Sequence, residues 1–246
     1  MALYDIPIAH RGLHGNGIPE NSMAAFQNAV EHGYNIELDV RILKDGNVAI
    51  SHDLNMKRMT GANKKVRYLT TDDLKQDKYR LPNGESLPLF SDVLDLVNGK
   101  SHIVCELKHP PWMKNCRLEE KVYKMIKGKP WVVIESFVPL SVGWFKDNAP
   151  EVTRGILSSV PQVWYLKLIT KLVDRDKALR KIVPNFLAFD INCLPNEQVV
   201  KVLKDFNLDL LVWTVNSTEK MKRALDVGAK NIIFEDIIPD LFINRT

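Results

Sequence analysis

Short apolar runs alternate with longer segments of helical spacing along most of the chain. The short runs span four to eight residues and are rich in β-branched side chains, which is typical of buried strands. We expect eight main strands, at residues 6–9, 35–42, 103–107, 131–134, 153–157, 186–190, 210–214 and 231–234. The segments between them carry apolar residues three and four apart and predict helices at 23–31, 91–97, 118–126, 140–148, 162–181, 196–206 and 217–227.

This alternation of strands and helices predicts a parallel sheet. Eight alternations without a Pro/Gly/Ser-rich linker favour an α/β fold of the TIM (β/α)8 barrel type over an open doubly wound sheet, as one domain across residues 1–246. No GxGxxG or GxxxxGK(S/T) run follows a strand, which argues against dinucleotide and P-loop sites. A short strand at 48–51 is expected to pair with 35–42 after a turn at residues 45–46.

One polar segment, residues 54–88, interrupts this alternation of strands and helices. It contains a Thr-Thr-Asp-Asp run at 70–73 and a Pro-Asn-Gly turn at 82–84. We therefore expect a small insertion after the second βα region, beside the mouth of the barrel.

Composition narrows the classes of function. Lys and Arg number 34 against 30 Asp and Glu, and this formal charge of +4 is too small to indicate a nucleic-acid partner. Cys105, Cys116 and Cys193 form no CxxC pair, which argues against a disulfide framework or a structural zinc site and fits a reducing compartment. No signal peptide and no apolar run of about 20 residues is visible, so we expect a soluble cytoplasmic protein.

Charged residues collect where the first strands end, which is where a TIM barrel carries its active site. Glu37 and Asp39 are two residues apart, so both side chains lie on one face of their strand, and we expect that face, and Glu106, to point inward. Buried carboxylates need positive partners, and Lys108 would neutralise only one of them. A hard cation that prefers oxygen ligands, Mg²⁺ or Ca²⁺, would supply the rest.

Taken singly, each of these residues has a plain structural interpretation. A pair of carboxylates on a strand belongs to an exposed edge or an ion pair about as often as to a functional site. Arg11 would pair with a surface acid, and an isolated His52 would be structural. Their occurrence together at the ends of the first βα units favours a catalytic site over structural ion pairing.

A set of short motifs is spaced along the chain. They are His-Arg-Gly at 10–12, Pro-Glu-Asn-Ser at 19–22, Ala-Phe at 25–26, Gly33, Glu-Leu-Asp-Val at 37–40, Asp-Gly at 45–46, His-Asp at 52–53, Glu-Leu-Lys at 106–108, Ser-Phe at 136–137 and Trp-Thr-Val-Asn at 213–216. This set resembles the motifs of the glycerophosphodiester phosphodiesterase family. The resemblance covers nearly the whole chain and is most specific between residues 10 and 53.

The resemblance implies a TIM barrel that hydrolyses glycerophosphodiesters to sn-glycerol 3-phosphate and an alcohol with one divalent cation. Carried over by position, the metal ligands would be Glu37, Asp39 and Glu106, the acid/base pair His10 and His52, and the phosphate-binding residues Arg11 and Lys108. The last strand departs from the family pattern, because it ends in Phe-Glu-Asp at 234–236 with its proline only at 239. The residues at this departure would contact the substrate, and they are neither the metal ligands nor the two histidines.

The chemistry of a phosphodiester agrees with these roles. Its anionic oxygens need neutralisation by the metal, Arg11 and Lys108, and its bridging oxygens need proton transfer by two histidines. Of the two, we favour His10 as base and His52 as acid. The glycerol 2-hydroxyl is a candidate nucleophile, and Trp213 at a strand end would form an apolar wall for glycerol.

Two other functions stay open at this point. One is a lysophospholipase D or sphingomyelinase D-like lipid phosphodiesterase, which an exposed apolar rim around the mouth would favour. The other is a non-catalytic glycerophosphate-binding barrel, against which the intact histidines and acids argue.

The partner we expect is a small-molecule glycerophosphodiester. The helix predicted at 162–181 mixes apolar and basic residues, and we favour a barrel helix packed on the sheet over one lying on a membrane. The sequence leaves the oligomeric state open, a homo-oligomer included.

Overall fold

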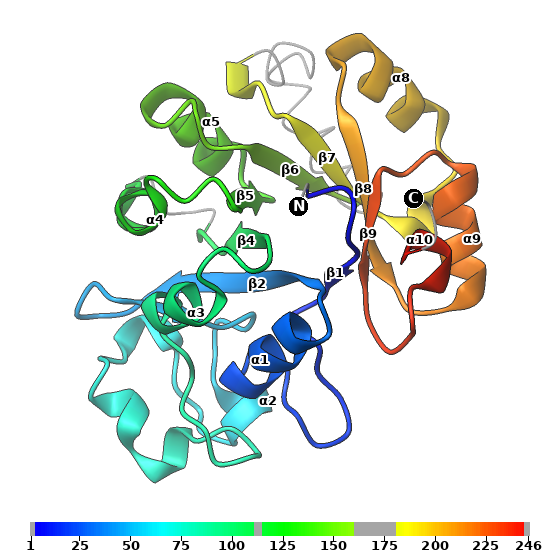
Figure 1. The fold of residues 1–246 in the computed structure, drawn as a ribbon. Coiled ribbons are helices and arrows are strands. Elements are labelled where there is room, and N and C mark those ends of the chain that lie inside the picture. The colour runs from blue at the N-terminus through cyan, green and yellow to red at the C-terminus, as the bar shows by residue number, and fades with distance from the viewer. Residues whose placement is uncertain (1–2, 111–114, 160–180, 244–246) are drawn as a thin grey trace.

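Eight parallel strands close into a barrel (Figure 1). The structure is a computed structural model that describes residues 3–110, 115–159 and 181–243. Its strands are β1 (Ile8–Ala9), β2 (Asn35–Ile42), β3 (Val48–Ile50), β4 (Ile103–Leu107), β5 (Val132–Ser136), β6 (Arg154–Ser158), β7 (Phe186–Asp190), β8 (Asp209–Val215) and β9 (Asn231–Phe234). The ring runs β1-β2-β4-β5-β6-β7-β8-β9, and β1 closes it by pairing with both β9 and β2. The predicted TIM barrel is confirmed.

The short strand β3 stands outside the ring. It pairs antiparallel with the end of β2, with Val40 opposite Ile50 and Ile42 opposite Val48. The hairpin predicted from the turn at 45–46 is therefore present, and it carries the chain from the barrel into the insertion.

Helices lie outside the ring of strands. They are α1 (Met23–Glu31), α2 (Lys57–Thr60), α3 (Phe90–Val97), α4 (Arg117–Ile126), α5 (Pro139–Asn148), α8 (Glu197–Phe206), α9 (Thr218–Asp226) and α10 (Asp240–Ile243). Ser22, Asn196 and Ser217 cap three of them by accepting backbone N–H groups of the first turn. Asn196 and Ser217 were expected to be the first helical residues, and the structure makes them caps instead. The helix predicted at 162–181 lies, except for Lys181, outside the described residues.

Two apolar layers hold the barrel. Side chains that point inward form one cluster, which includes Val104, Phe186 and Leu211. Their outward neighbours along the strands pack against the helices, and Cys105 on β4 belongs to that outer layer, as strand alternation predicts. Inward positions near the carboxyl ends of the strands therefore face the mouth of the barrel.

The insertion has a small apolar core of its own, which its polar composition did not reveal. Met56, Val66, Leu69 and Leu74 are buried there against Leu43 and Ala49 of the β2–β3 hairpin, and the segment between them includes short helical turns. The insertion also touches the barrel, since the Glu85 carboxylate accepts the Met23 N–H at the start of α1. Within the described residues, no helix combines the length and apolar character needed to cross a bilayer.

Candidate active site

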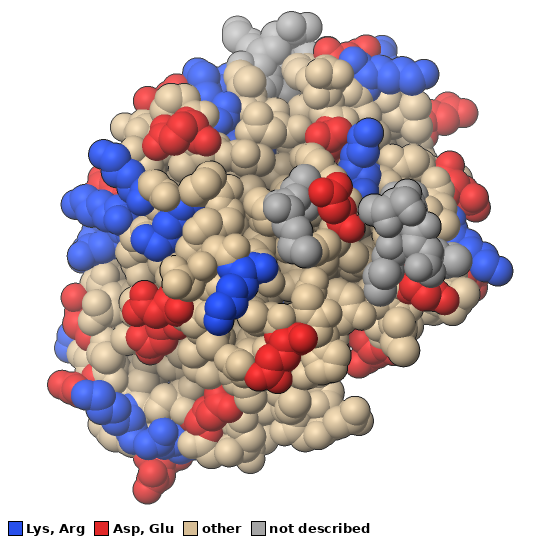
Figure 2. Space-filling view, viewed as in Figure 1, with Lys and Arg blue, Asp and Glu red and all other residues tan. Residues whose placement is uncertain are grey.

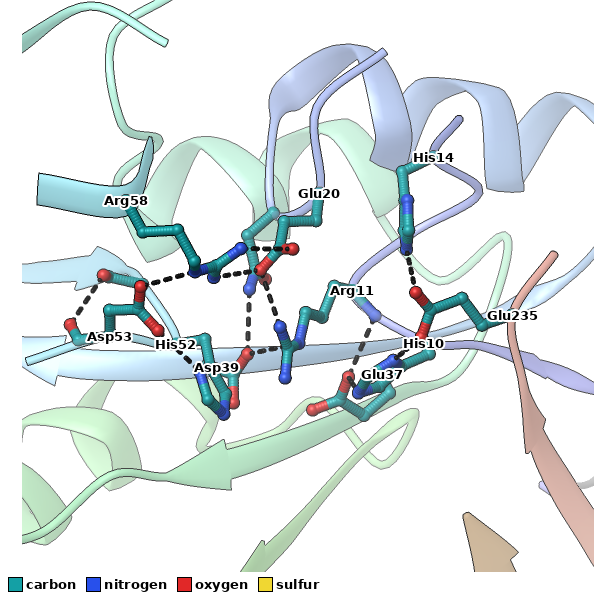
Figure 3. A network of polar contacts seen from close by, with 12 residues as sticks. His10, Arg11, His14, Glu20, Glu37, Asp39, His52, Asp53, Arg58 and Glu235 are labelled. Carbon is teal, nitrogen blue, oxygen red and sulfur yellow. Dashed lines mark hydrogen bonds and ion pairs between the residues drawn. The ribbon is translucent and has the colours of Figure 1, made fainter. Parts of the chain in front are cut away.

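Most of the residues expected to carry chemistry lie at the carboxyl ends of β1, β2 and β4. Figure 3 shows those that belong to β2 or follow β1 and β3. His10 and Arg11 follow β1, Glu37 and Asp39 lie on β2, and His52 follows β3. Asp39 stands directly opposite Glu106 of β4 in the parallel register. Barrel closure thus brings distant segments of the chain to one mouth.

Three buried carboxylates form the centre of this site. Glu37, Asp39 and Glu106 are 3%, 1% and 7% exposed, and each offers an oxygen within 4.8 Å of the others. Burial raises the pKa of Glu37 well above its usual value, and Asp39 and Glu106 raise it further. Burial also raises the pKa of Glu106 to about 7 against the lowering effect of Lys108. Burial would raise the pKa of Asp39 as well, but Lys108 and neighbouring cations outweigh it and hold that pKa below its usual range.

The protein supplies two cations to this cluster. The Lys108 ammonium lies 3.0 Å from Asp39 Oδ1 and 2.7 Å from Glu106 Oε2. The Arg11 guanidinium lies 3.5 Å from Asp39 Oδ2, and its backbone N–H donates to Glu37 Oε2 at 2.9 Å. Neither cation reaches Glu37 closely with its side chain, so the cluster keeps an excess of negative charge around that carboxyl.

These residues fit a divalent cation. A compact set of three buried carboxylates offers only oxygen ligands, as Mg²⁺ and Ca²⁺ require. The raised pKa values of Glu37 and Glu106 agree with this, because neighbouring acids contribute to both shifts and a bound divalent cation would allow all three acids to ionise together. Asn21 donates to Asp39 Oδ2 at 2.8 Å, while Ser22 is the cap of α1.

His10 is oriented by a carboxylate from the other end of the chain. Its Nδ1 lies 2.6 Å from Oε2 of Glu235, which follows β9, and this hydrogen bond lowers the pKa of Glu235. An ionised carboxylate only accepts, so Nδ1 carries the proton and Nε2 is left as an acceptor, 3.9 Å from Glu37 Oε2. The other oxygen of Glu235 lies 3.5 Å from His14 Nε2. In the sequence, Glu235 is part of the departure of the last strand from the family pattern.

His52 is oriented by its neighbour in sequence. Its Nδ1 lies 2.8 Å from Oδ1 of Asp53, whose other oxygen accepts from Arg58 Nε at 2.7 Å. The Arg58 guanidinium also donates to the Glu20 carboxylate, which accepts a second hydrogen bond from Arg11. Burial lowers the pKa of His52, although Asp53 acts in the opposite direction.

Arg41 is a further residue that the sequence did not single out. Its guanidinium donates to the His52 carbonyl at 3.2 and 2.6 Å and to the Lys108 carbonyl at 3.3 Å. Arg41 thereby ties the backbone after β3 to the backbone after β4. The sequence carries no signal for this role, because both acceptors are main-chain atoms.

Glu135 is a fourth buried acid that the sequence analysis missed. It is 1% exposed on β5, stands opposite Glu106, and has one oxygen, Oε2, without a hydrogen-bond partner. Burial raises its pKa well above the usual value, and Glu106 raises it further. The predicted strand ended at residue 134, whereas β5 continues to Ser136, and alternation from Val133 would have placed Glu135 inside.

Trp213 lines the interior on the far side from β4. It packs edge-to-face on Phe137 at 5.7 Å between ring centroids, and both rings contact the inner apolar cluster. Its indole Nε1 is buried without a hydrogen-bond partner. Trp213 and Phe137 thus form an apolar wall. The contact of this wall with a substrate stays a prediction.

Comparison with known proteins agrees with this arrangement. The model of the glycerophosphoryl diester phosphodiesterase family matches residues 10–238. A glycerophosphodiester phosphodiesterase of Caldanaerobacter subterraneus subsp. tengcongensis is 31% identical over 96% of each chain, and one of Bacillus altitudinis is 30% identical over 91% of each. In fold, the chain resembles an Oleispira antarctica phosphodiesterase solved with its product sn-glycerol-3-phosphate, with a TM-score of 0.75, 22% identity and 93% of each chain covered. The chain therefore belongs to the glycerophosphoryl diester phosphodiesterase family.

Proposed function

We propose that this enzyme hydrolyses glycerophosphodiesters to sn-glycerol 3-phosphate and an alcohol, with one divalent cation and two histidines. The observation that carries the proposal is the group of three buried carboxylates flanked by two histidines, each with a carboxylate on Nδ1. The named relatives and the product in the Oleispira antarctica structure support the choice of substrate.

Glu37, Asp39 and Glu106 would hold the cation, Mg²⁺ or Ca²⁺. When bound, it supplies neutralisation of the charge that develops on the non-bridging phosphate oxygens. Arg11 and Lys108 share that work from the protein side, because both side chains lie at the edge of the acidic cluster. Trp213 would contribute an apolar surface for the glycerol carbons.

His10 is the proposed base and His52 the proposed acid. Glu235 keeps the proton of His10 on Nδ1, so Nε2 can accept a proton at the mouth. Burial lowers the pKa of His52, which makes its protonated form a stronger acid toward a leaving alkoxide. The substrate's 2-hydroxyl is the proposed nucleophile: its oxygen attacks phosphorus and its proton goes to His10. The bond from phosphorus to the leaving oxygen breaks as His52 protonates that oxygen, and water then opens the cyclic phosphate to glycerol 3-phosphate.

The test is an assay of purified protein with glycerophosphodiesters, with and without EDTA, measuring released glycerol 3-phosphate. Activity should disappear with chelator and return with Mg²⁺ or Ca²⁺. Glu37→Gln should fold normally and bind the metal more weakly in a direct titration. Full activity in excess EDTA would remove the cation from the proposal, and equal turnover of a 2-deoxy analogue would remove the internal nucleophile.

A lipid-directed phosphodiesterase is the second candidate. Leu140 at the start of α5 and Ile238 after β9 are 46% and 75% exposed, and both follow carboxyl ends of strands. The same assay with lysophospholipids in place of deacylated substrates distinguishes this candidate. The cytoplasmic location expected from the cysteines stays a prediction, and Cys105, Cys116 and Cys193 are all free thiols.

A further inference from the structure

A basic pocket of about 480 Å³ lies beside the mouth, between the β2–β3 hairpin, the insertion and the start of α4. Basic side chains contribute much of its lining, and none of the described residues that line it is Asp or Glu. The basic members are Arg41, Lys44, Arg67, Lys108 and Arg117. Figure 2 shows Lys and Arg side chains gathered over the region of α4.

Three of these cations lack an acidic partner. Lys44, Arg67 and Arg117 form no ion pair with Asp or Glu of the described residues, in contrast to Arg11 and Arg58 of the active site. Arg67 lies over the Tyr68 ring, 4.6 Å from its centroid, and its Nε is buried without a hydrogen-bond partner. Cations left unpaired around one pocket repel each other, and an anion in the pocket would relieve that repulsion.

The pocket adjoins the proposed reacting groups on one side only. Lys108 lines the pocket and also contacts Asp39 and Glu106. Arg41, another lining residue, donates to the carbonyl of His52. His10, by contrast, lies toward β9 with Glu235. Since His52 is the proposed donor of a proton to the leaving oxygen, the pocket lies on the leaving-group side of the phosphodiester.

We propose that this pocket binds a phosphate group carried by the leaving alcohol, so that the enzyme prefers glycerophosphodiesters whose alcohol is itself phosphorylated. Arg67 and Arg117 offer guanidinium forks that match phosphate oxygens, and Lys44 adds a point charge. The proposal rests on the proposed hydrolysis and specifies its substrate class. An alcohol with a positive charge, in the same place, would be repelled by these side chains.

The matched substrate pair is glycerophosphoglycerol and bis(glycerophospho)glycerol, which differ by one glycerophosphate on the leaving alcohol. We expect kcat/KM to be about tenfold higher for the second, beyond the factor of about two that its two equivalent ends supply, because one charge-assisted contact is worth about a factor of ten. The preference should shrink as salt screens the pocket.

The variants Lys44→Gln, Arg67→Gln and Arg117→Gln should each reduce this preference, and the triple variant should abolish it. Turnover of glycerophosphoglycerol should stay unchanged, because none of the three touches the carboxylates or histidines in the structure. Lys124→Gln is the matched control, since it removes the same charge from the exposed part of α4 outside this pocket and should keep the preference.

Binding measured by calorimetry in EDTA separates the two proposals. If neither substrate is hydrolysed but bis(glycerophospho)glycerol binds more tightly and the triple variant loses that difference, the pocket assignment stands and the proposed reaction fails. If glycerophosphoglycerol turns over and the preference is absent, or survives in the triple variant, the pocket assignment is overturned. If inorganic phosphate abolishes the preference without inhibiting glycerophosphoglycerol hydrolysis, phosphate itself is the recognised group. If it inhibits both substrates equally, the pocket does not select the leaving group.

Discussion

His10 and His52 occupy corresponding positions on either side of the acidic cluster, yet the protein holds them differently (Figure 3). His10 depends on Glu235, which is 225 residues away and reaches it only because β1 pairs with β9. His52 depends on Asp53, the next residue, which it shares with Arg58. The side chain of His10 is 17% exposed and that of His52 36%.

The two histidines are therefore oriented by two different kinds of contact. We expect the His10 side to be the more rigid of the two, because the closed sheet and the turn at Arg11 and Gly12 position it. The His52 side depends on a chain of ion pairs from Asp53 through Arg58 to Glu20. Ion pairs at a surface contribute little stability individually and respond to pH and salt. We therefore expect substitutions that alter the backbone to impair the His10 side most, and substitutions that remove a charge to impair the His52 side most.

The largest effect should come from the histidines themselves. His10→Ala and His52→Ala should each lower kcat by about 10²–10⁴, the usual contribution of a positioned proton transfer. Metal binding, measured directly, should persist in both. His14→Ala is the control, because His14 contacts Glu235 only at 3.5 Å, and it should lose far less activity. A variant of either histidine with wild-type turnover would make that residue structural.

The turn after β1 should be the most sensitive backbone element of the His10 side. Gly12 has φ +80, and a Cβ there would lie 2.9 Å from the backbone carbon of Ala25. Gly12→Ala should lower the free energy of unfolding by about 2–3 kcal/mol, because backbone strain and a clash add together. Gly17 has φ +87 with no atom within 4 Å of such a Cβ, so Gly17→Ala carries the backbone strain alone, about 1 kcal/mol.

Urea unfolding of both variants measures this difference. Gly12→Ala should also lower kcat, since Arg11 with φ +53 directs its N–H to Glu37 from the same turn. Equal stability of the two alanine variants would show that α1 moves aside at no cost, and the His10 side would then be less rigid than we infer.

Much of the barrel could be predicted from the sequence because its strands are buried on both faces and its helices are amphipathic. The bounds predicted for β2, β4, β7 and β9 coincide with the structure, and so do those of α1. The acidic cluster followed from the spacing of Glu37 and Asp39, because alternation places both on one face of a strand.

The supporting residues could not be predicted in the same way. The contact between His10 and Glu235 exists only once the barrel closes, and Arg41 binds main-chain oxygens that any residue would offer. Glu135 was missed for a different reason, since a strand end misplaced by two residues left it outside the sheet. Local pattern thus identifies the groups proposed for chemistry more readily than the groups that orient them.

The orienting carboxylates should have smaller effects than the histidines. Glu235→Gln should lower kcat by about 10–100-fold, the usual loss when a carboxylate that orients a histidine is removed. Asp53→Asn should have a similar or smaller effect and should also move the pH profile. Burial lowers the pKa of His52, and the hydrogen bond from Asp53 partly offsets this, so losing the carboxylate lowers that pKa further. Activity that needs protonated His52 should then decline at a lower pH than in the wild type.

The pH profile of kcat/KM for Asp53→Asn checks this direction. Arg58→Gln is the comparison variant, because it removes the cation that competes for Asp53 and leaves the carboxylate in place. An acid limb that moves to lower pH in Asp53→Asn, with the alkaline limb unchanged, would reverse the acid and base roles of the two histidines.

The smallest expected effect concerns Glu20, the far end of the ion-pair chain on the His52 side. Burial alone would raise its pKa, but hydrogen bonds and charges from Arg58 and Arg11 outweigh burial and lower it to about 2. A carboxyl whose pKa is lowered by folding contributes stability above its unfolded pKa of about 4.3, and this contribution is lost as the pH falls toward 2. Because Glu20 is only partly buried and solvent screens the pairs, we expect a contribution of about 1 kcal/mol or less.

Urea unfolding of wild type and Glu20→Gln between pH 7 and 2 should show the wild-type advantage in the free energy of unfolding shrinking through this window. An advantage that stays constant down to pH 2 would mean that Glu20 acts through packing and not through charge.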